Sequence, residues 1–252
     1  MGKPLIQQRR GKGSPTFRAP THRSIGAVSL RPLDYRELEG VVYGKIVDIV
    51  KDTFHTAPLM IVEYETGEEV LLPAPEGVYV GQVVASGSLA PINPGNVTFL
   101  KNIPVGTKIS MIEIKPGDGG KLVRAGGTAA ILVQKTETKA IVQLPSGKLK
   151  ELPLDCRAMI GQLAGGGRTD LPFVKAGNKY YRMSALNRYW PRPAAVAMNA
   201  VDHPFGGKHR RNHGGNVPVP KKGYPIKYGY YGPRKTGRGS KGERVGTKKK
   251  EE

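Results

Sequence analysis

Three histidines near the carboxyl end of the chain have the residue type and spacing that could do chemistry. His203, His209 and His213 lie in the stretch VAMNAVDHPFGGKHRRNHGG, together with one carboxylate, Asp202. The spacing of four residues between His209 and His213 would place two metal ligands on one face of a helix. An aspartate next to a histidine also raises the question of a catalytic triad, which a serine would complete.

The surroundings of these histidines disfavour both kinds of site. GGKHRRNHGG is a poor helix, and Arg210 and Arg211 lie between the two histidines, where they would repel a metal cation. A zinc ion would need a ligand from a distant part of the chain, and adjacency of Asp202 and His203 does not supply triad geometry. We therefore expect no metal, no cofactor and no catalytic residue here. We expect imidazoles that donate to phosphate or stack on bases.

The net charge indicates a polyanionic partner. The chain has 252 residues, with 40 Lys and Arg against 20 Asp and Glu, which gives a net charge of +20. Such a chain attracts nucleic acid or an anionic membrane surface. It has no apolar run near the roughly 20 residues that a membrane span needs, and no apolar signal-peptide core follows its basic amino terminus. We expect an intracellular, cytoplasmic protein without a membrane partner.

Most of the excess charge lies at the two ends of the chain. Residues 1–36 carry eight basic residues and one acidic residue, and residues 200–252 carry fourteen and four, so these ends hold +17 of the net charge. Neither end has the hydrophobic periodicity of a folded element. Single aromatic residues, such as Phe17 and Tyr230, lie among the charges. We expect irregular arms that become ordered on RNA, and solvated tails are the alternative.

The arms supply most of the residues that we predict to bind RNA. The cationic and imidazole side chains predicted to contact phosphates or bases are Arg9, Arg10, Lys12, Arg18, His22, Arg23, Arg192, Lys208, His209, Arg210, Arg211, His213, Lys221, Lys222, Arg234, Lys235 and Arg238.

Two glycine-rich segments, KPGDGGKLVRAGGT (115–128) and LAGGGRTD (163–170), raise the question of a phosphate-binding loop. A P-loop needs G-x-x-x-x-G-K-[ST], but Lys115 stands at the first glycine position and Leu122 follows the Gly-Lys pair. No dinucleotide fingerprint follows a strand, so these nucleotide sites are excluded. We expect exposed backbone amides suited to RNA phosphates, with plain tight turns as the alternative. The side chains predicted to act beside them are Lys121, Arg124 and Arg168.

The middle of the chain reads as short apolar runs between turns, which is typical of small β-barrels. The expected strands are 41–50, 59–64, 68–73, 128–135, 139–145 and 148–153. We expect two successive barrels, at residues 37–112 and 113–190, with a short helix near residues 183–189. The segments 61–82 and 141–162 share seven identical residues at an offset of 80, which indicates two similar hairpins but does not establish a duplication.

The only cysteine is expected to be structural. Cys156 has no partner for an internal disulfide, which fits a reducing compartment. Its surroundings, LPLDCRAMIGQL, are typical of a strand. We therefore expect an inert side chain and no nucleophile.

Several motifs along the chain resemble one known family. They are GKGSPTFRA (11–19), APL (57–59), EGVYVGQ (76–82), NPGNV (93–97), KPGDGGKLVRAGG (115–127), LPSGK (144–148), AGGGRTDLPFVKAG (164–177) and WPRPAAVAMNAVDHPFGG (190–207). In this order they resemble the ribosomal protein L2 family of the large subunit, in its archaeal and eukaryotic form. The resemblance covers nearly the whole chain. It implies a mainly β fold, with an oligonucleotide-binding-like (OB-like) barrel at 37–112, an SH3-like barrel at 113–190, and irregular basic extensions at 1–36 and 191–252.

The resemblance also implies a function. Members of this family are structural components of the large ribosomal subunit and not enzymes. They are primary binders of large-subunit rRNA, and they support subunit association and the architecture of the peptidyl transferase centre, where rRNA performs the chemistry. The implied partners are large-subunit rRNA, neighbouring large-subunit proteins and the small subunit across the interface. The implied location is the cytoplasmic ribosome.

One motif carries the most specific part of the resemblance. His203 matches the histidine of the family's HPxGG loop, which lies near the RNA that frames the peptidyl transferase centre. Two residues depart from the family pattern: Ala200 stands where many members have Pro, and Lys208 stands where a third Gly is common. Because of these departures, the family pattern does not fix the backbone path after Gly207. Lys208 also adds a candidate phosphate contact. The RNA-binding residues that this block adds are Asn199, His203, Phe205, Gly206 and Gly207.

Two other functions stay open at this point. A non-ribosomal RNA- or DNA-binding protein would share the charge but would bind duplexes broadly. A metal-dependent nuclease would act through His203, His209 and His213, bind stoichiometric metal and lose activity with a chelator.

Overall fold

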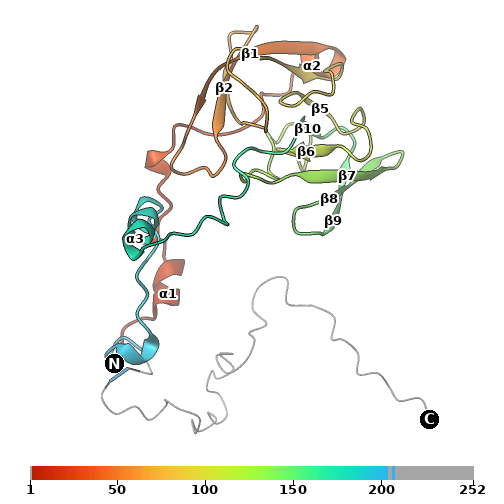
Figure 1. Cartoon of the computed structure of the whole chain (residues 1–252). Helices are drawn as coiled ribbons and strands as arrows, with labels where there is room; N and C mark the ends of the chain where they lie inside the picture. Colours follow the sequence, from red (N-terminus) through yellow and green to blue (C-terminus); the bar gives the residue numbers. More distant parts are fainter. Residues whose placement is uncertain (1, 204–205, 208–252) are drawn as a thin grey trace, which may run out of the picture. The chain divides into compact units, whose positions relative to one another are not determined.

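The structure of the chain is a computed structural model that describes residues 2–203 and 206–207. Contacts between residues divide the chain into two units, residues 14–190 and residues 1–13 together with 191–252. The larger unit holds every strand that the structure describes (Figure 1). The described part of the smaller unit contains helix α1 (Ile6–Gly11) and the 3-10 helix η2 (Ala195–Ala197). Each unit is therefore considered by itself.

The larger unit is mainly β, as the sequence predicts. Its strands are β1 (Val41–Val50), β2 (Leu59–Tyr64), β3 (Glu69–Pro73), β4 (Val83–Gly87), β5 (Val97–Phe99), β6 (Lys108–Ser110), β7 (Ala130–Lys135), β8 (Lys139–Gln143), β9 (Leu149–Pro153) and β10 (Arg157–Ile160). They form one sheet in the order β3-β2-β1-β4-β5-β10-β6-β7-β8-β9. Neighbouring strands are antiparallel except for β4 and β5. All six expected strands are present, and β10 lies in the strand-like segment around Cys156, whereas β4, β5 and β6 were not predicted.

Alternation of apolar and polar residues explains the long strand β1. Val42 and Ile46 point into the core, while Tyr43 and Lys45 between them point outward. Gly44 also lies on the inner face, and a Cβ atom there would come within 2.8 Å of side-chain atoms of Tyr64 and Val62. The glycine therefore lets β1 and β2 pack closely.

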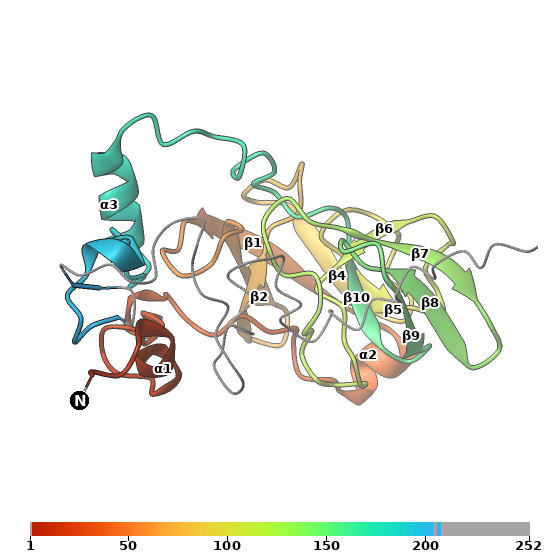
Figure 2. The ribbon, with the colours of Figure 1, turned by 90° about the horizontal axis from the view of Figure 1, so that it is seen from below.

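The sheet encloses two separate apolar cores. Ile46 and Leu59 belong to the first core, and Leu132 and Val142 belong to the second. Strand β10 serves both, because successive side chains of a strand point to opposite faces: Met159 packs in the first core and Ala158 in the second. Figure 2 shows β10 in the middle, between β4 on one side and β7 and β8 on the other. Burying each of the large apolar side chains of these cores, such as Ile46 or Leu132, contributes about 1.5–3 kcal/mol.

The two hairpins that share sequence also share geometry. The five residue pairs between β2 and β3 recur between β8 and β9 with every number raised by 80. The turns agree as well, since Gly67 and Gly147 have φ angles of 78° and 80°. Leu72 is buried in the first core and Leu152 in the second. The predicted similarity of the hairpins is confirmed.

A fully buried arginine links the two barrels. Arg157, on β10, donates through Nη1 to Glu37 Oε2 at 2.5 Å and through Nη2 to Glu113 Oε1 at 2.7 Å. Glu37 belongs to α2 (Tyr35–Glu39), next to the first core, and Glu113 follows β6 at the edge of the second. All three side chains are completely buried. Burial alone would lower the pKa of Arg157, but hydrogen bonds to Glu113 and the charge of Glu37 outweigh it and raise the pKa.

A second arginine extends this buried network to the surface. Arg31 donates to Glu37 at 3.4 Å and to Asp34 at 2.6 Å, and its Nε lies 2.6 Å from a carboxylate oxygen of Glu68. Its backbone carbonyl accepts a hydrogen bond of 2.8 Å from Arg157. Charges in an apolar interior are tolerated only when paired in this way. The network therefore determines how residues 31–37 enter the first barrel.

The expected extension at residues 1–36 is only partly irregular. It contains helix α1 and the 3-10 helix η1 (Thr21–Arg23). Helices this short leave no apolar periodicity in the sequence, so the pattern did not reveal them. Val28 and Leu30 are buried in the first core. The expectation that this end lacks folded elements was wrong.

The helix expected near residues 183–189 lies earlier, as α3 (Ala176–Ala185). It ends at Ala185, and Asn187, two residues further on, has a φ of 51°. The amides of Asn187 and Arg188 donate back to Ser184 and Met183, a Schellman motif that stops the helix. In the part of the chain that the structure describes, no helix is long and apolar enough to cross a membrane.

Cys156 lies one residue before β10 and not within a strand. It is fully buried in the second core, and burial raises the pKa of its thiol to about 12. A thiol in this environment stays protonated at neutral pH, so the structural interpretation is supported.

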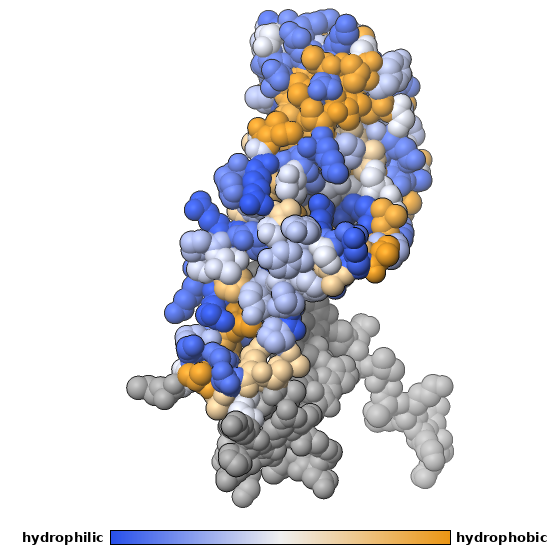
Figure 3. All heavy atoms as spheres, turned by 60° about the vertical axis from the view of Figure 1, so that its left-hand side comes forward, coloured by the Kyte–Doolittle hydropathy of each residue, from blue (hydrophilic) through white to orange (hydrophobic). Residues whose placement is uncertain are grey.

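The first barrel exposes apolar side chains on one face. Figure 3 shows apolar residues gathered over the part of the molecule that contains β1 and β2. Exposed apolar residues of its strands include Val47 on β1 and Val83 on β4. Single exposed apolar residues are normal in proteins. Val83 also lines a cavity of about 390 Å³ with residues of β1 and β2, among them Tyr43, Lys45 and Glu63.

Replacing Arg157 by Ala should destabilise the fold by about 3–5 kcal/mol, because it leaves two buried carboxylates without their partner. Urea unfolding of the full chain measures this loss. The matched control is Lys139→Ala, which removes an exposed ion pair with Glu151. A loss for Arg157→Ala as small as that of the control would contradict the role assigned to the network.

Acid should weaken the contact between Asp34 and Arg31. The hydrogen bond from Arg31 lowers the pKa of Asp34 from 3.8 to about 2. Because the folded pKa is depressed, this contribution is complete above the ordinary pKa and is lost as the pH falls from about 4 to about 2. Asp34→Asn keeps an acceptor for the amide of Glu37 but removes the charge. Its unfolding free energy should fall less steeply over this range, and an unchanged slope would contradict the assignment.

Candidate nucleic-acid interface

One backbone hydrogen bond and one ion pair join the amino-terminal segment of the smaller unit to residues 201–202. The amide of Lys3 donates to the carbonyl of Val201 at 2.7 Å, and the Lys3 ammonium lies 3.5 Å from Asp202 Oδ1. The carbonyl of Asn199 accepts from the amides of Asp202 and His203. The segment that contains the sequence-predicted residues is thus folded against the amino terminus.

Glycine at position 206 is required by close packing of the backbone. A Cβ atom there would lie 2.3 Å from the carbonyl oxygen of Asn199. Gly207 has a φ of 100° and donates to the carbonyl of Met198 at 3.0 Å. These two glycines close the loop onto residues 198–199. They act as structural residues, which is a role that the sequence motif alone did not reveal.

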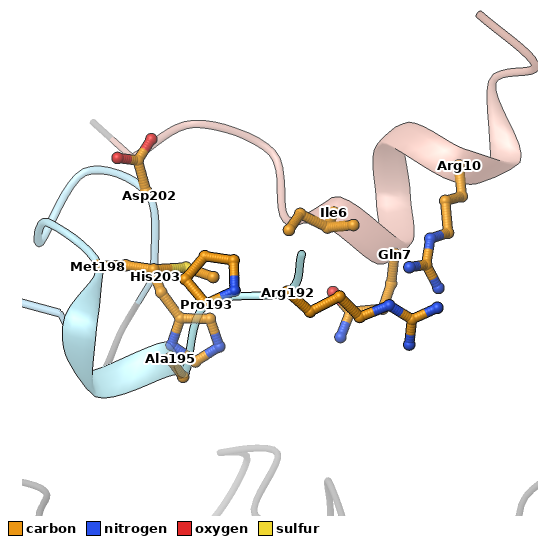
Figure 4. A pocket seen from close by; sticks show the side chains of 9 residues that line it. All are labelled: Ile6, Gln7, Arg10, Arg192, Pro193, Ala195, Met198, Asp202 and His203. Atoms are coloured by element: carbon orange, nitrogen blue, oxygen red, sulfur yellow. The ribbon is translucent and has the colours of Figure 1, made fainter. Parts of the chain in front are cut away.

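Three of the predicted RNA-binding residues meet at one pocket of this unit. Arg10 from α1, Arg192 and His203 line a cavity of about 200 Å³. The remaining lining residues are Ile6, Gln7, Pro193, Ala195, Met198 and Asp202. Figure 4 shows the guanidinium groups of Arg10 and Arg192 gathered at one end of the pocket and the imidazole of His203 at the other.

The charge of this pocket suits an anion. Two guanidinium groups line it, and the only carboxylate among its lining residues is that of Asp202. That carboxylate is paired with Lys3 and points away from the other side chains in Figure 4. Guanidinium groups bind phosphate oxygens with paired hydrogen bonds, so the pocket can hold a phosphate group of RNA.

The described residues contain one Ser-Asp-His group, but its geometry is not that of a catalytic triad. Ser24 Oγ and the His55 amide both donate to Asp52 Oδ2 at 3.1 Å, and the His55 ring contacts the same oxygen. Burial opposes ionisation of Asp52, but the hydrogen bonds from His55 outweigh it and lower the pKa. In a triad the histidine must bond to the serine, which this arrangement does not provide. Nor do the described residues contain a group of three His, Cys, Asp or Glu that could hold a metal ion.

The glycine-rich loop at 115–128 does not present free amides as expected. The amides of Gly117 and Gly119 donate to the carboxylate of Glu113, and that of Gly120 donates to Asp118. A carboxylate of the protein therefore occupies the place that we assigned to an RNA phosphate. This part of the prediction was wrong, because the pattern shows that amides are available but not which anion binds them.

The two glycine-rich loops also pack on each other. A Cβ at Gly127 would lie 2.5 Å from the Cα of Gly166, and a Cβ at Gly126 would lie 2.7 Å from the carbonyl oxygen of Thr56. Thr56 further accepts a hydrogen bond from the Gly126 amide through its side chain. These glycines are needed for close backbone packing within the larger unit.

The cations of these loops differ in their freedom to bind RNA. Lys121 and Arg168 are exposed. Arg124 is partly buried and donates to the carbonyl of Val28 at 2.7 Å, so it also holds the amino-terminal segment in place. Lys121 and Arg168 stay candidates for phosphate contacts.

Other predicted residues lie at the surface of their units. Arg9 and Lys12 are exposed at the end of α1, and Arg18 and His22 are exposed in the larger unit. Arg23 is exposed too and donates to the carbonyl of Ala185. The predicted residues that lie outside the described part of the chain are Phe205, Lys208, His209, Arg210, Arg211, His213, Lys221, Lys222, Arg234, Lys235 and Arg238.

Sequence reasoning missed a cluster of aromatic rings and cations around α3. Tyr180 lies near Trp190, with a ring-centroid distance of 6.4 Å, and the ammonium of Lys179 lies 5.6 Å from the Trp190 ring. The stretch NKYYRMSALNRYW carries four aromatic residues and three cations without an acid. That composition could have identified the cluster.

Gly206→Ala should loosen the loop that carries His203. Overpacking costs typically about 1–3 kcal/mol, so exchange of the Gly207 amide hydrogen should accelerate about 5- to 150-fold. Amide hydrogen exchange followed by NMR measures this change. Gly177→Ala is the matched control, since nothing lies within 4 Å of its added methyl group. Unchanged protection in Gly206→Ala would refute the packing argument.

Comparisons with known proteins agree with this structure. The family described as "Ribosomal Proteins L2, RNA binding N-terminal domain" matches residues 2–86, and "Ribosomal Proteins L2, C-terminal domain" matches residues 93–223. These domains have OB-like and SH3-like folds, so the predicted fold class is confirmed.

Similar full-length proteins are found in archaea. A protein named "Large ribosomal subunit protein uL2" from Nanoarchaeum equitans is 55% identical over 241 residues, which cover 95% of this chain and 100% of the relative. Proteins with the same name from Methanocaldococcus jannaschii and Archaeoglobus fulgidus are 50% and 47% identical, each over 94% of this chain and 99% of the relative. All three are named as ribosomal proteins and not as enzymes. The chain therefore belongs to the ribosomal protein L2 family.

Proposed function

We propose that this chain is a structural, RNA-binding component of the large ribosomal subunit and a primary binder of its rRNA. The observation that supports this most directly is the pocket that joins Arg10, Arg192 and His203 from opposite ends of the chain. The names of the relatives support the same function. The place of action is the ribosome in the cytoplasm.

Electrostatics supplies most of the affinity in this proposal. The folded barrels are held rigid by their cores, and the cations at the two ends neutralise phosphates and release bound counterions. Exposed cations of the larger unit, such as Lys121 and Arg168, add contacts. The RNA-binding residues named from the sequence, including those outside the described part, stay predictions in this proposal. So do the domain limits at 36/37, 112/113 and 190/191.

A finer part of the proposal concerns the loop at His203. The resemblance implies that this loop lies near the RNA of the peptidyl transferase centre and supports subunit association. Its partners would then include neighbouring large-subunit proteins and the small subunit. The close backbone packing at Gly206 and the cationic pocket are consistent with a loop that holds RNA in one conformation.

Loss of the pocket cations should weaken rRNA binding and reduce its dependence on salt. For every phosphate that Arg10→Gln or Arg192→Gln no longer neutralises, the slope of log K against log salt should fall by about 0.7–0.9. Fluorescence anisotropy with labelled large-subunit rRNA measures the slope. Lys139→Gln is the control, since the charge of Lys139 is already paired with Glu151 at 2.8 Å. The proposal fails if the double variant keeps the slope of the wild-type chain.

His203→Ala should impair subunit association or peptide-bond formation more than rRNA binding, because two arginines in the pocket remain to hold phosphate. Ribosomes that carry only this variant are compared with the wild type in a subunit-joining and a peptidyl-transfer assay. Normal behaviour in both assays would count against this role of His203, but it would not count against the proposed binding of rRNA.

A further inference from the structure

Helix α3 has almost no support from the protein itself. None of its ten residues, all of which the structure describes, is buried. An isolated helix of this length is marginal in water. Its carboxyl end is held by hydrogen bonds from Asn187 to the carbonyls of Pro15 and Arg18 and from Arg23 to the carbonyl of Ala185. The sides of the helix are therefore available to a partner.

Aromatic rings lie near one another at this helix and the turn that follows it. Tyr180 lies edge-on to the ring of Tyr181, at 5.6 Å between centroids, and to the ring of Trp190, at 6.4 Å. Phe17 lies 6.3 Å from Tyr189. Tyr180 and Tyr181 are 50% and 74% exposed, so much of each ring is open to a partner. The rings thus form a platform with open faces.

A pocket of about 210 Å³ lies at this platform. Its lining residues are Thr16, Tyr180, Ser184, Asn187, Arg188, Tyr189 and Trp190. The rings offer stacking surfaces, Ser184 and Thr16 offer hydroxyl groups, and Arg188 offers a guanidinium group. This combination of stacking, hydrogen bonding and positive charge in one small pocket fits a nucleotide.

The charge around the pocket selects an anionic partner. Residues 171–190 include Lys175, Lys179, Arg182 and Arg188 and no acidic residue. The ammonium of Lys179 lies over the ring of Trp190, so a phosphate next to a stacked base would meet a cation. An apolar protein segment would not need these cations, which favours RNA as the occupant.

We infer that the pocket at α3, lined by Tyr180, Arg188 and Trp190, binds one unpaired nucleotide of RNA. The base stacks on the rings, and the adjoining phosphate binds Arg188 and Lys179. This inference rests on the proposed RNA-binding function and adds to it a base-dependent contact, whereas the pocket at Arg10 and Arg192 binds phosphate. Binding also explains how a helix without buried residues is stabilised.

The single tryptophan of the chain makes the inference testable. Trp190 is the only one in the sequence, so intrinsic tryptophan fluorescence reports on this pocket alone. The full chain is titrated with a single-stranded RNA oligonucleotide and with an abasic oligonucleotide of equal length and charge. Stacking of a base should quench Trp190 with the first ligand but not with the second. Equal quenching by both, or none by either, overturns the inference.

Variants separate stacking from charge. Tyr180→Leu should lower affinity for the base-bearing oligonucleotide by about 5-fold or more, as expected when one base no longer stacks on a ring, whereas Tyr180→Phe should keep it. Tyr79→Leu is the matched control, because Tyr79 is 65% exposed on the first barrel. Equal affinities for Tyr180→Leu and the control overturn the inference.

Binding of labelled large-subunit rRNA is measured in parallel by anisotropy. If rRNA binds but Trp190 shows no base-dependent quenching, the nucleotide pocket is refuted while the proposed function stands. If no RNA binds, both are refuted.

Discussion

The pairing of Arg157 with Glu37 and Glu113 is the constraint on which the larger unit depends. A guanidinium group without exposure to solvent is tolerable only with both carboxylates in place. Glu37 lies on α2 and Glu113 follows β6, so the pairing joins the first core to the second. Strand β10 reinforces this link, because its side chains enter both cores. The OB-like and SH3-like barrels thus form a continuous support.

The cations of this chain are divided between the inside of the fold and its surface. Arg31, Arg124 and Arg157 are used inside the fold, where carboxylates and carbonyls hold them. The carboxylate of Glu113 accepts hydrogen bonds from amides of the glycine-rich loop, so that loop has a structural role. The positive charge left over lies at the ends of the chain and around α3. A rigid, internally neutralised support with an excess of charge outside it suits a protein that binds rRNA along several surfaces.

The sequence was sufficient to predict the parts of the fold with strong periodicity. Strand β1 and the hairpins at Gly67 and Gly147 were found because alternating apolar residues and turn glycines leave a local pattern. Strands β5 and β6 have three residues each, too few for alternation to be recognised. The limits of α3 depended on the left-handed conformation of Asn187, which is seldom adopted by residues other than glycine.

The candidate sites were predicted less completely, for a physical reason. Residue type indicated the cations and His203, but only folding brought Arg10 and Arg192 to the same pocket. The role assigned to the loop amides was wrong, because local sequence does not show that Glu113 reaches them. The nucleotide pocket at α3 was missed because its rings come from both sides of a turn.

Sedimentation of the tagged full chain through a sucrose gradient at high salt tests the central claim most directly. A component built into the large subunit should migrate with that subunit at salt concentrations that strip loosely bound cationic proteins. The reason is that many simultaneous contacts with rRNA keep it on the subunit, whereas a loosely bound protein depends on a few salt-sensitive ones. Recovery of the chain only in the free fractions would contradict the account.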